Sequence, residues 1–153
     1  MEETSIESRL QRHLIDTLYV EAMVLADEAR TYFDEGGRID RDSLDPMSRV
    51  GFSCESLKVT TRLMHVIAWL LTQRAIDAGE MSARDALDPS RRLGPAPNSD
   101  HVLVASLPTA ARDLINTSID LFRRTERLDA QQSAVGQIDS PVHAMLDRLA
   151  YSL

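Results

Sequence analysis

The stretch that decides the fold is DPMSRVGFSCESLKVTTRLMHVIAWLLTQRAIDAG, which spans residues 45–79. Asp45 is a residue type that caps helix N-termini, and Pro46 suits the first helical position. Gly79 is typical of the position just past the end of a helix. We therefore predict one helix over residues 46–78, which at 1.5 Å per residue is about 50 Å long.

Within this helix, the run LMHVIAWLL at residues 63–71 is apolar on nearly every side. A helix of that kind is covered by neighbours over most of its surface. Two partner helices in the same chain leave one side uncovered, so the sequence predicts a homodimer that uses this helix. The residues assigned to the packing and dimer face are Leu63, Met64, Val66, Ile67, Trp69, Leu70 and Leu71.

A second long helix is predicted over residues 5–35, before this stretch. Thr4 and Glu7 have the spacing of a capping box, and the pair Gly36–Gly37 is a stop signal. The apolar residues recur near helical spacing and predict one buried stripe with an acidic outer face. The stripe consists of Ile6, Leu10, Leu14, Leu18, Met23, Ala26, Ala29 and Phe33.

A third long helix is predicted over residues 107–131, after an irregular connector over residues 80–105 that is rich in proline and glycine. Its buried stripe consists of Ala111, Leu114, Ile115, Ser118, Phe122 and Leu128. Residues 132–153 are predicted to be a flexible C-terminal tail with a short helix over residues 141–150. The predicted fold is therefore all-α, a three-helix bundle of long antiparallel helices over residues 1–131.

Composition excludes several classes of protein. The 153 residues suit a single domain, and the one cysteine, Cys54, excludes a disulfide framework and a cysteine-rich zinc site. We interpret Cys54 as a small core residue. The net charge of −7 counts against binding to nucleic acid. The opening Met1-Glu2-Glu3 lacks the pattern of a signal peptide, and no apolar run reaches the ~20 residues that span a membrane, so we expect a cytoplasmic protein without membrane insertion.

No catalytic, metal-binding or cofactor-binding pattern is present, and the sequence predicts a protein that is not an enzyme. The histidines His13, His65, His101 and His143 occur without Glu-x-x-His or His-Glu-x-x-His spacing. The stretch Gly51–Glu55 lacks the second glycine of a nucleophile elbow. No glycine-rich nucleotide-binding loop occurs either. We expect no metal and no cofactor.

Two regulatory alternatives remain. His65 is a candidate phosphoacceptor of a phosphotransfer bundle, although Ala68 and Trp69 replace the lysine and small residue typical there. Its simpler interpretation is a half-buried histidine with one hydrogen-bond partner. Residues 75–94 are a candidate DNA-binding helix-turn-helix that would present Arg84, Arg91 and Arg92, although Pro89 and the acidic balance disfavour it.

A basic cluster lies in the third predicted helix. Arg123, Arg124 and Arg127 are within two turns of one another near its C-terminal end. They are a candidate docking patch for an acidic partner protein. The alternative is a solvated helix face with local ion pairs to Glu126 and Asp120.

The central helix adds a specific signal. The segment SCESLKVTTRLMHVIAWLL, residues 53–71, resembles the corresponding helix of the RcdA family, the regulators of CtrA degradation of alphaproteobacteria. The residues that carry this resemblance are Glu55, Ser56, Thr60, Thr61 and Arg62. Gln73-Arg74-Ala75, the acidic first helix and the Gly-Gly stop also resemble the family. His65 departs from the family pattern, which has glutamine there, and so does Cys54.

The resemblance implies a three-helix bundle that forms a homodimer and acts as a non-enzymatic adaptor. Members of the family deliver cell-cycle regulators to the ClpXP protease after the response regulator CpdR has primed it. They bind cargo proteins, and they recruit PopA, a second adaptor that binds cyclic di-GMP and brings the master regulator CtrA. The resemblance also implies recruitment to the cell pole.

Overall fold

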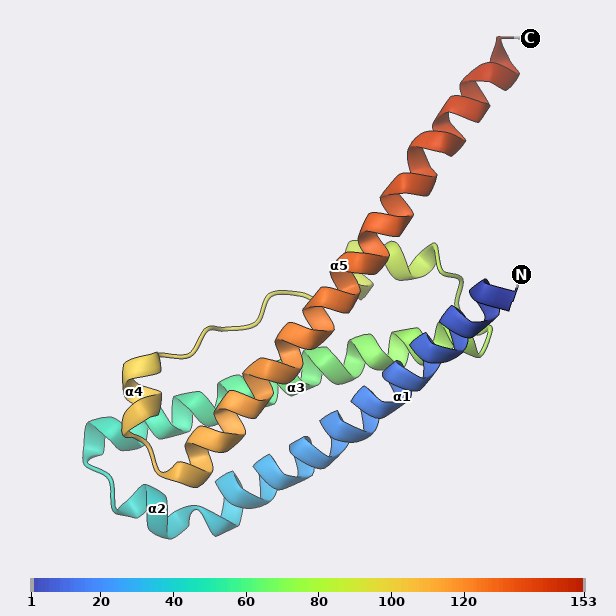
Figure 1. Ribbon diagram of the computed structural model, residues 1–153. Helices are drawn as coiled ribbons and strands as arrows, with labels where there is room; N and C mark the ends of the chain where they lie inside the picture. The colour runs from blue at the N-terminus through green and yellow to red at the C-terminus, as the bar shows by residue number, and fades with distance from the viewer. Residues whose placement is uncertain (1, 153) are drawn as a thin grey trace.

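The computed structural model describes residues 2–152, with the side chains of residue 4, residues 135–144 and residue 147 outside the description. Three long helices form the framework: α1 (Glu2–Thr31), α3 (Pro46–Asp77) and α5 (Thr109–Tyr151). Two short helices, α2 (Arg38–Asp42) and α4 (His101–Ser106), lie together at one end of the bundle (Figure 1). The described residues contain no strand, and the prediction of an all-α bundle of three long helices is confirmed.

The direction of the helices follows from the connector. Figure 1 shows that residues 78–100 return along the length of the bundle, so α5 begins at the same end as α3. Paired contacts agree, because Arg62 contacts Ser118 and Trp69 contacts Asp129 in the same order along both helices. The helices α3 and α5 are therefore parallel, and the antiparallel relation holds for α1 with each of them.

The ends of α3 are those that the sequence predicts. The carboxylate of Asp45 accepts a hydrogen bond from the backbone N–H of Ser48, and Pro46 occupies the first turn. Ala78 caps the C-terminus, and Gly79 follows with φ of +75°, a conformation that glycine adopts at no steric cost.

The first helix ends as expected but buries different residues. A π-helical turn, η1 (Tyr32–Gly36), follows α1, and Gly37 is required because a Cβ there would lie 2.7 Å from the carbonyl oxygen of Tyr32. The buried residues of α1 are Ile15, Leu18, Ala22, Leu25 and Ala29. The predicted stripe is wrong at Ile6, Leu10, Leu14 and Met23, which are all exposed. Burial of Ile6, Leu10 and Leu14 needs a neighbouring helix beside the N-terminal part of α1, and α5 diverges from the bundle there (Figure 1). Met23 directly follows the buried Ala22, so it lies about 100° around the helix from the buried stripe.

The connector is more ordered than the sequence indicates. It contains the 3₁₀ turns η2 (Asp85–Leu87) and η3 (Pro89–Arg91) and the helix α4, which Asp100 caps through the N–H groups of Val102 and Leu103. Gly51 lets α4 approach α3 closely, because a Cβ at this position would lie 2.4 Å from a methyl carbon of Leu103.

The third helix continues where the sequence predicts its end. The helix α5 begins at Thr109 and runs past residue 131 to Tyr151, through the segment predicted as a tail. Ala130, Gln131 and Gln132 are good helix formers, so nothing in the local sequence stops the helix at that point. Its buried positions include Ala111, Ile115 and Ser118, as predicted.

Candidate functional site

Two charged residues lie on the buried side of α3. Glu55 and Arg62 are separated by seven residues, which places them on one face of the helix two turns apart. Glu55 is 0% exposed and Arg62 is 3% exposed. Burying a charged group costs free energy unless the group is paired and hydrogen-bonded. The partners of Glu55 and Arg62 therefore show which parts of the chain these two residues hold together.

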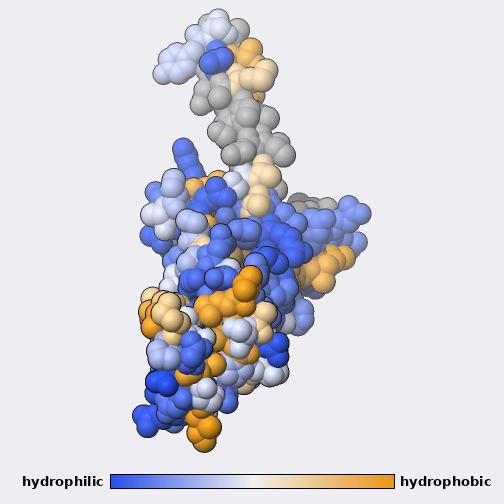
Figure 2. Space-filling view, turned by 90° about the vertical axis from the view of Figure 1, so that its left-hand side faces the viewer, coloured by the Kyte–Doolittle hydropathy of each residue, from blue (hydrophilic) through white to orange (hydrophobic). Residues whose placement is uncertain are grey.

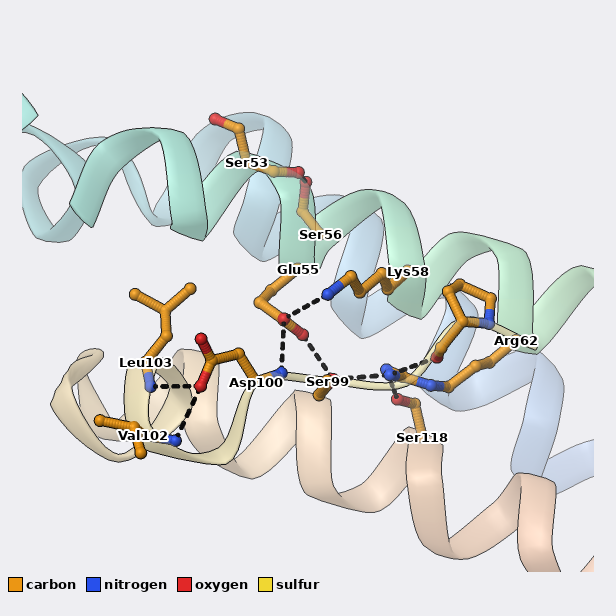
Figure 3. A network of polar contacts seen from close by, with 11 residues as sticks. Ser53, Glu55, Ser56, Lys58, Arg62, Ser99, Asp100, Val102, Leu103 and Ser118 are labelled. Atoms are coloured by element: carbon orange, nitrogen blue, oxygen red, sulfur yellow. Dashed lines mark hydrogen bonds and ion pairs between the residues drawn. The ribbon is translucent and has the colours of Figure 1, made fainter. Parts of the chain in front are cut away.

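The carboxylate of Glu55 receives three hydrogen bonds (Figure 3). The ammonium group of Lys58 donates to Oε1 over 3.0 Å, and the backbone N–H of Asp100 donates to the same oxygen over 3.4 Å. The hydroxyl of Ser99 donates to Oε2. Both Ser99 and Asp100 belong to the connector, so Glu55 holds the residues that immediately precede α4.

The guanidinium of Arg62 completes the network (Figure 3). One nitrogen donates to the Ser118 hydroxyl over 3.3 Å, and the other donates to the Pro97 carbonyl over 3.0 Å and to Ser99 over 2.6 Å. Burial lowers the pKa of Arg62, and the charge of Glu55 opposes that shift. Arg62 therefore joins α3, the connector and α5 at one point. We call Glu55, Arg62, Ser99 and their hydrogen bonds the connector latch.

The other residues of the family motif have a local role. The hydroxyls of Ser56, Thr60 and Thr61 donate to backbone carbonyls three or four residues earlier in α3. Glu55 and Arg62 therefore join the connector latch, whereas the three hydroxyl groups are not brought into it.

A second polar contact holds the connector further along α5. The indole N–H of Trp69 donates to Asp129 over 3.1 Å, and Arg92 forms an ion pair with the other oxygen of that carboxylate over 3.0 Å. Neither Ser99 nor Asp129 is predicted from the sequence, and Arg92 is predicted to face DNA, not to form this ion pair. Their partners lie between 37 and 60 residues away in the chain, so no local pattern identifies them.

A hollow of about 360 Å³ lies beside the connector latch. The connector contributes residues 95–99 to its walls, and His101 of α4 and Arg62 of α3 also line it. The wall on α5 consists of Ile119, Phe122, Arg123 and Glu126. The volume is near the lower end of the range for small-molecule sites, which is roughly 300–1,000 Å³. The hollow combines two arginines with one acidic side chain and an aromatic ring.

The predicted basic cluster divides in the structure. Arg124 forms a bidentate pair with Glu21 of α1 and a 3.0 Å ion pair with Asp120, so its guanidinium joins two helices. The hydrogen bond to Glu21 is the main reason that the pKa of Arg124 lies above its ordinary value. Arg123 and Arg127 are exposed, and only these two remain available to a partner.

The predicted dimer face also divides. Leu63, Val66, Trp69 and Leu70 are buried inside the bundle, and Ile67 packs against that core. Met64 is 65% exposed and Leu71 is 47% exposed. They continue a line of uncharged residues on the opposite side of α3, with alternating spacings of three and four. This line, which we call the outer α3 face, consists of Met47, Val50, Cys54, Leu57, Thr61, Met64, Ala68 and Leu71.

Large apolar side chains of the outer α3 face are open to solvent. Met47 is 78% exposed, Val50 is 59% exposed and Leu57 is 67% exposed. Figure 2, which views the end of the bundle where α2 and α4 lie, shows hydrophobic residues on the surface there. Cys54 is exposed, so its interpretation as a core residue is wrong, because it lies on the side of α3 opposite the core.

The structure gives little support to a phosphoacceptor at His65 or to a DNA-binding motif at residues 75–94. His65 is half-buried, and its Nδ1 atom is enclosed without a hydrogen-bond partner. The candidate helix-turn-helix at residues 75–94 lacks its second helix, because after the end of α3 this segment contains only the two 3₁₀ turns η2 and η3. Among the described residues, no group of three or more His, Cys, Asp or Glu side chains could hold a metal ion. No described helix is long and apolar enough to cross a membrane.

The chain is similar to known proteins in both sequence and structure. The family model described as "Protein of unknown function (DUF1465)" matches residues 6–153. The structure is similar to the crystal structure of RcdA from Caulobacter crescentus CB15, with 32% sequence identity and a TM-score of 0.65. The similarity covers 79% of this chain and 92% of that chain. No curated protein sequence matches.

Proposed function

Because this chain belongs to the DUF1465 family, which is the RcdA-type family, we propose that it is a non-enzymatic adaptor for regulated proteolysis. In this role it helps to deliver cell-cycle regulators to the ClpXP protease after CpdR has primed the protease. It works in the cytoplasm and is recruited to the cell pole with its partners. The observation that carries the proposal is the similarity to RcdA over 79% of the chain.

The outer α3 face supports a role in protein contact. From Met47 to Leu71 it extends for about 36 Å along the helix, and all of its residues are uncharged. The alternation of three and four residues is the spacing with which one helix packs along another. Burying apolar surface is worth roughly 25 cal/mol per Å², so covering this face favours association. We assign it to the homodimer.

A second surface suits partner proteins. Arg123 lines the hollow beside the connector latch, and Arg127 is exposed one turn further along α5. Two cations next to an apolar wall at Phe122 fit an acidic segment that also carries an apolar side chain. We assign this surface to cargo or to a PopA-like adaptor. Arg124 has no part in it, because its guanidinium pairs with Glu21 and Asp120.

The experiment that tests the function is reconstituted proteolysis. ClpXP and CpdR from the same organism are incubated with candidate cargo, CtrA among them, with and without this chain. We expect the initial rate of cargo loss to rise only when both CpdR and this chain are present. An unchanged rate with every candidate, from a chain that is folded, would contradict the adaptor role.

Charge reversal tests the partner surface in the same assay. Arg123→Glu with Arg127→Glu is expected to reduce the stimulation of cargo loss. The matched control is Arg30→Glu with Arg38→Glu, which reverses two exposed charges away from this surface and should leave the stimulation unchanged. Equal stimulation by both variants would remove Arg123 and Arg127 from the proposal.

A further inference from the structure

A groove opens at the end of the bundle where α5 leaves it. Its walls are the N-terminal part of α1, the end of α3, residues 80–91 of the connector and α5 near residues 128–132. Its volume is about 1780 Å³. Apolar side chains that line it are open to solvent, with Leu10 64% exposed, Leu14 43% exposed and Leu87 37% exposed.

The end of α5 presents an apolar face that no other described element covers. Figure 1 shows that α5 projects past the ends of α1 and α3. Met145 is 66% exposed, Leu146 is 55% exposed and Leu149 is 57% exposed. Their spacings of one, three and four residues place them on one side of a helix. Solvent-exposed apolar surfaces of this size, one concave and one helical, indicate a docking pair.

We propose that residues 142–151 fold back into the groove of the same chain, as a short fourth helix of the bundle. The helix shown in Figure 1 is then the undocked arrangement, in which both apolar surfaces are open. Docking covers Leu10 and Leu14 with the face that carries Met145, Leu146 and Leu149.

The sequence between groove and tail favours a reversal of the chain. Gln132 lines the groove, and Gly136 and Pro141 follow within ten residues. Glycine and proline are the two residues that most weaken a helix interior, and a residue before proline disfavours the helical conformation. The six residues from 136 to 141 are enough for a turn between packed helices, which typically takes about 2–8 residues.

The short connection favours the chain's own tail over a tail from a second copy. Nine residues, 133–141, lie between Gln132 and the docking helix, and a short link of this kind gives an effective concentration on the order of millimolar. The docking helix would be about 15 Å long, which is sufficient to cover the part of α1 between Ser8 and Ile15.

Distance measurement by spin labelling tests the proposal in the full chain. Cys54, the only cysteine and an exposed one, is first replaced by serine. Labels are then attached at Gln11→Cys in the groove and at Arg148→Cys in the tail. In the undocked helix, position 148 lies about 24 Å along α5 from Gln132. Docking brings the two labels to a distance typical of neighbouring helices, so we expect a population at short distance.

Matched variants identify the surface. Leu10→Asp, in the groove, should abolish the short-distance population. Val20→Asp, at a position that is 61% exposed on α1 but outside the groove, should retain it. Gly136→Ala with Pro141→Ala should also abolish it, because the helix is then favoured throughout. Far-ultraviolet circular dichroism verifies that each variant is folded.

Three results would overturn the proposal. The first is a distance distribution with only the long distance. The second is a short distance that disappears when labelled chain is diluted with unlabelled chain, because a second copy then occupies the groove. The third is a short distance that Leu10→Asp leaves unchanged, which means that the tail docks elsewhere.

Discussion

The two sides of α3 differ in where their charge lies, because the buried side combines apolar side chains with two charged ones and the outer side has none. The side packed inside the bundle carries the charged residues Glu55 and Arg62, which are almost completely buried. The opposite side, the outer α3 face, carries uncharged residues, and the large apolar ones among them are open to solvent. Buried charge on α3 therefore holds the connector against the bundle, whereas exposed apolar surface on α3 is available to other proteins.

The largest effect is expected from breaking the buried side. Arg62→Met removes the donor shared by the Pro97 carbonyl and the hydroxyls of Ser99 and Ser118. Lys58 still pairs with the carboxylate of Glu55 in this variant. Leaving a buried polar group without its partner costs about 1–3 kcal/mol, so the free energy of unfolding should fall by at least that amount. Urea unfolding followed by circular dichroism measures it.

A double variant sharpens this test. Glu55→Leu combined with Arg62→Met removes both buried charges of the connector latch, so it should lose less stability than the sum of the losses in the two single variants. If the double variant loses as much as the sum of the two single variants, the two residues do not act as one unit, and the connector latch is wrongly assigned.

The next effect concerns the contact between α3 and α4. In Gly51→Ala, the added methyl group collides with Leu103, whose methyl carbon would lie 2.4 Å from it. Overpacking of this kind typically costs about 1–3 kcal/mol, and the higher helix propensity of alanine offsets about 1 kcal/mol of that cost. The control is Gly94→Ala, since nothing lies within 4 Å of a Cβ added there. Equal unfolding midpoints for the two variants would contradict the close packing of α4.

A smaller effect on stability is expected from the N-terminal cap of α3, Asp45. Hydrogen bonds from Ser48 lower the pKa of Asp45, so this carboxylate stabilises the fold at neutral pH. A lowered pKa means that the stabilisation is present above the unfolded-state pKa of about 4 and is lost as the pH falls through the folded-state value. The stability difference between wild type and Asp45→Ala should therefore shrink on acidification. Asp45→Asn keeps the capping oxygen without titrating, and its stability should not show this acidic loss.

The smallest effect on the single chain is expected on the outer α3 face. Leu57→Glu with Met64→Glu places charges at exposed positions, so the free energy of unfolding of the monomer should change by no more than about 0.5 kcal/mol for each substitution. A large loss of stability in dilute solution would mean that these side chains belong to the core, and the contrast between the two sides of α3 would be wrong.

Local signals in the sequence predict the ends of α3 correctly. Asp45, Pro46 and Gly79 act on backbone groups within a few residues, so the sequence contains the whole interaction. The same holds for the π-helical turn before Gly37, where the glycine pair marks the end of α1.

Long-range contacts are the part that the sequence does not predict. Arg62 binds Pro97 and Ser118, which are 35 and 56 residues away, so its role depends on how the connector folds back. The exposure of Leu10 and Leu14 likewise depends on where α5 leaves the bundle. The outer α3 face is different, because its alternation of three and four residues is present in the sequence. The dense apolar run at residues 63–71 obscures it, since both sides of the helix are apolar there.

The mass of the protein in solution tests most directly whether the outer α3 face is a contact surface. Sedimentation equilibrium at several concentrations compares wild type with the variant Leu57→Glu, Met64→Glu. We expect twice the chain mass of 17.1 kDa for wild type and the single-chain mass for the variant. A single-chain mass for wild type at every concentration, or twice the chain mass for both proteins, would contradict it.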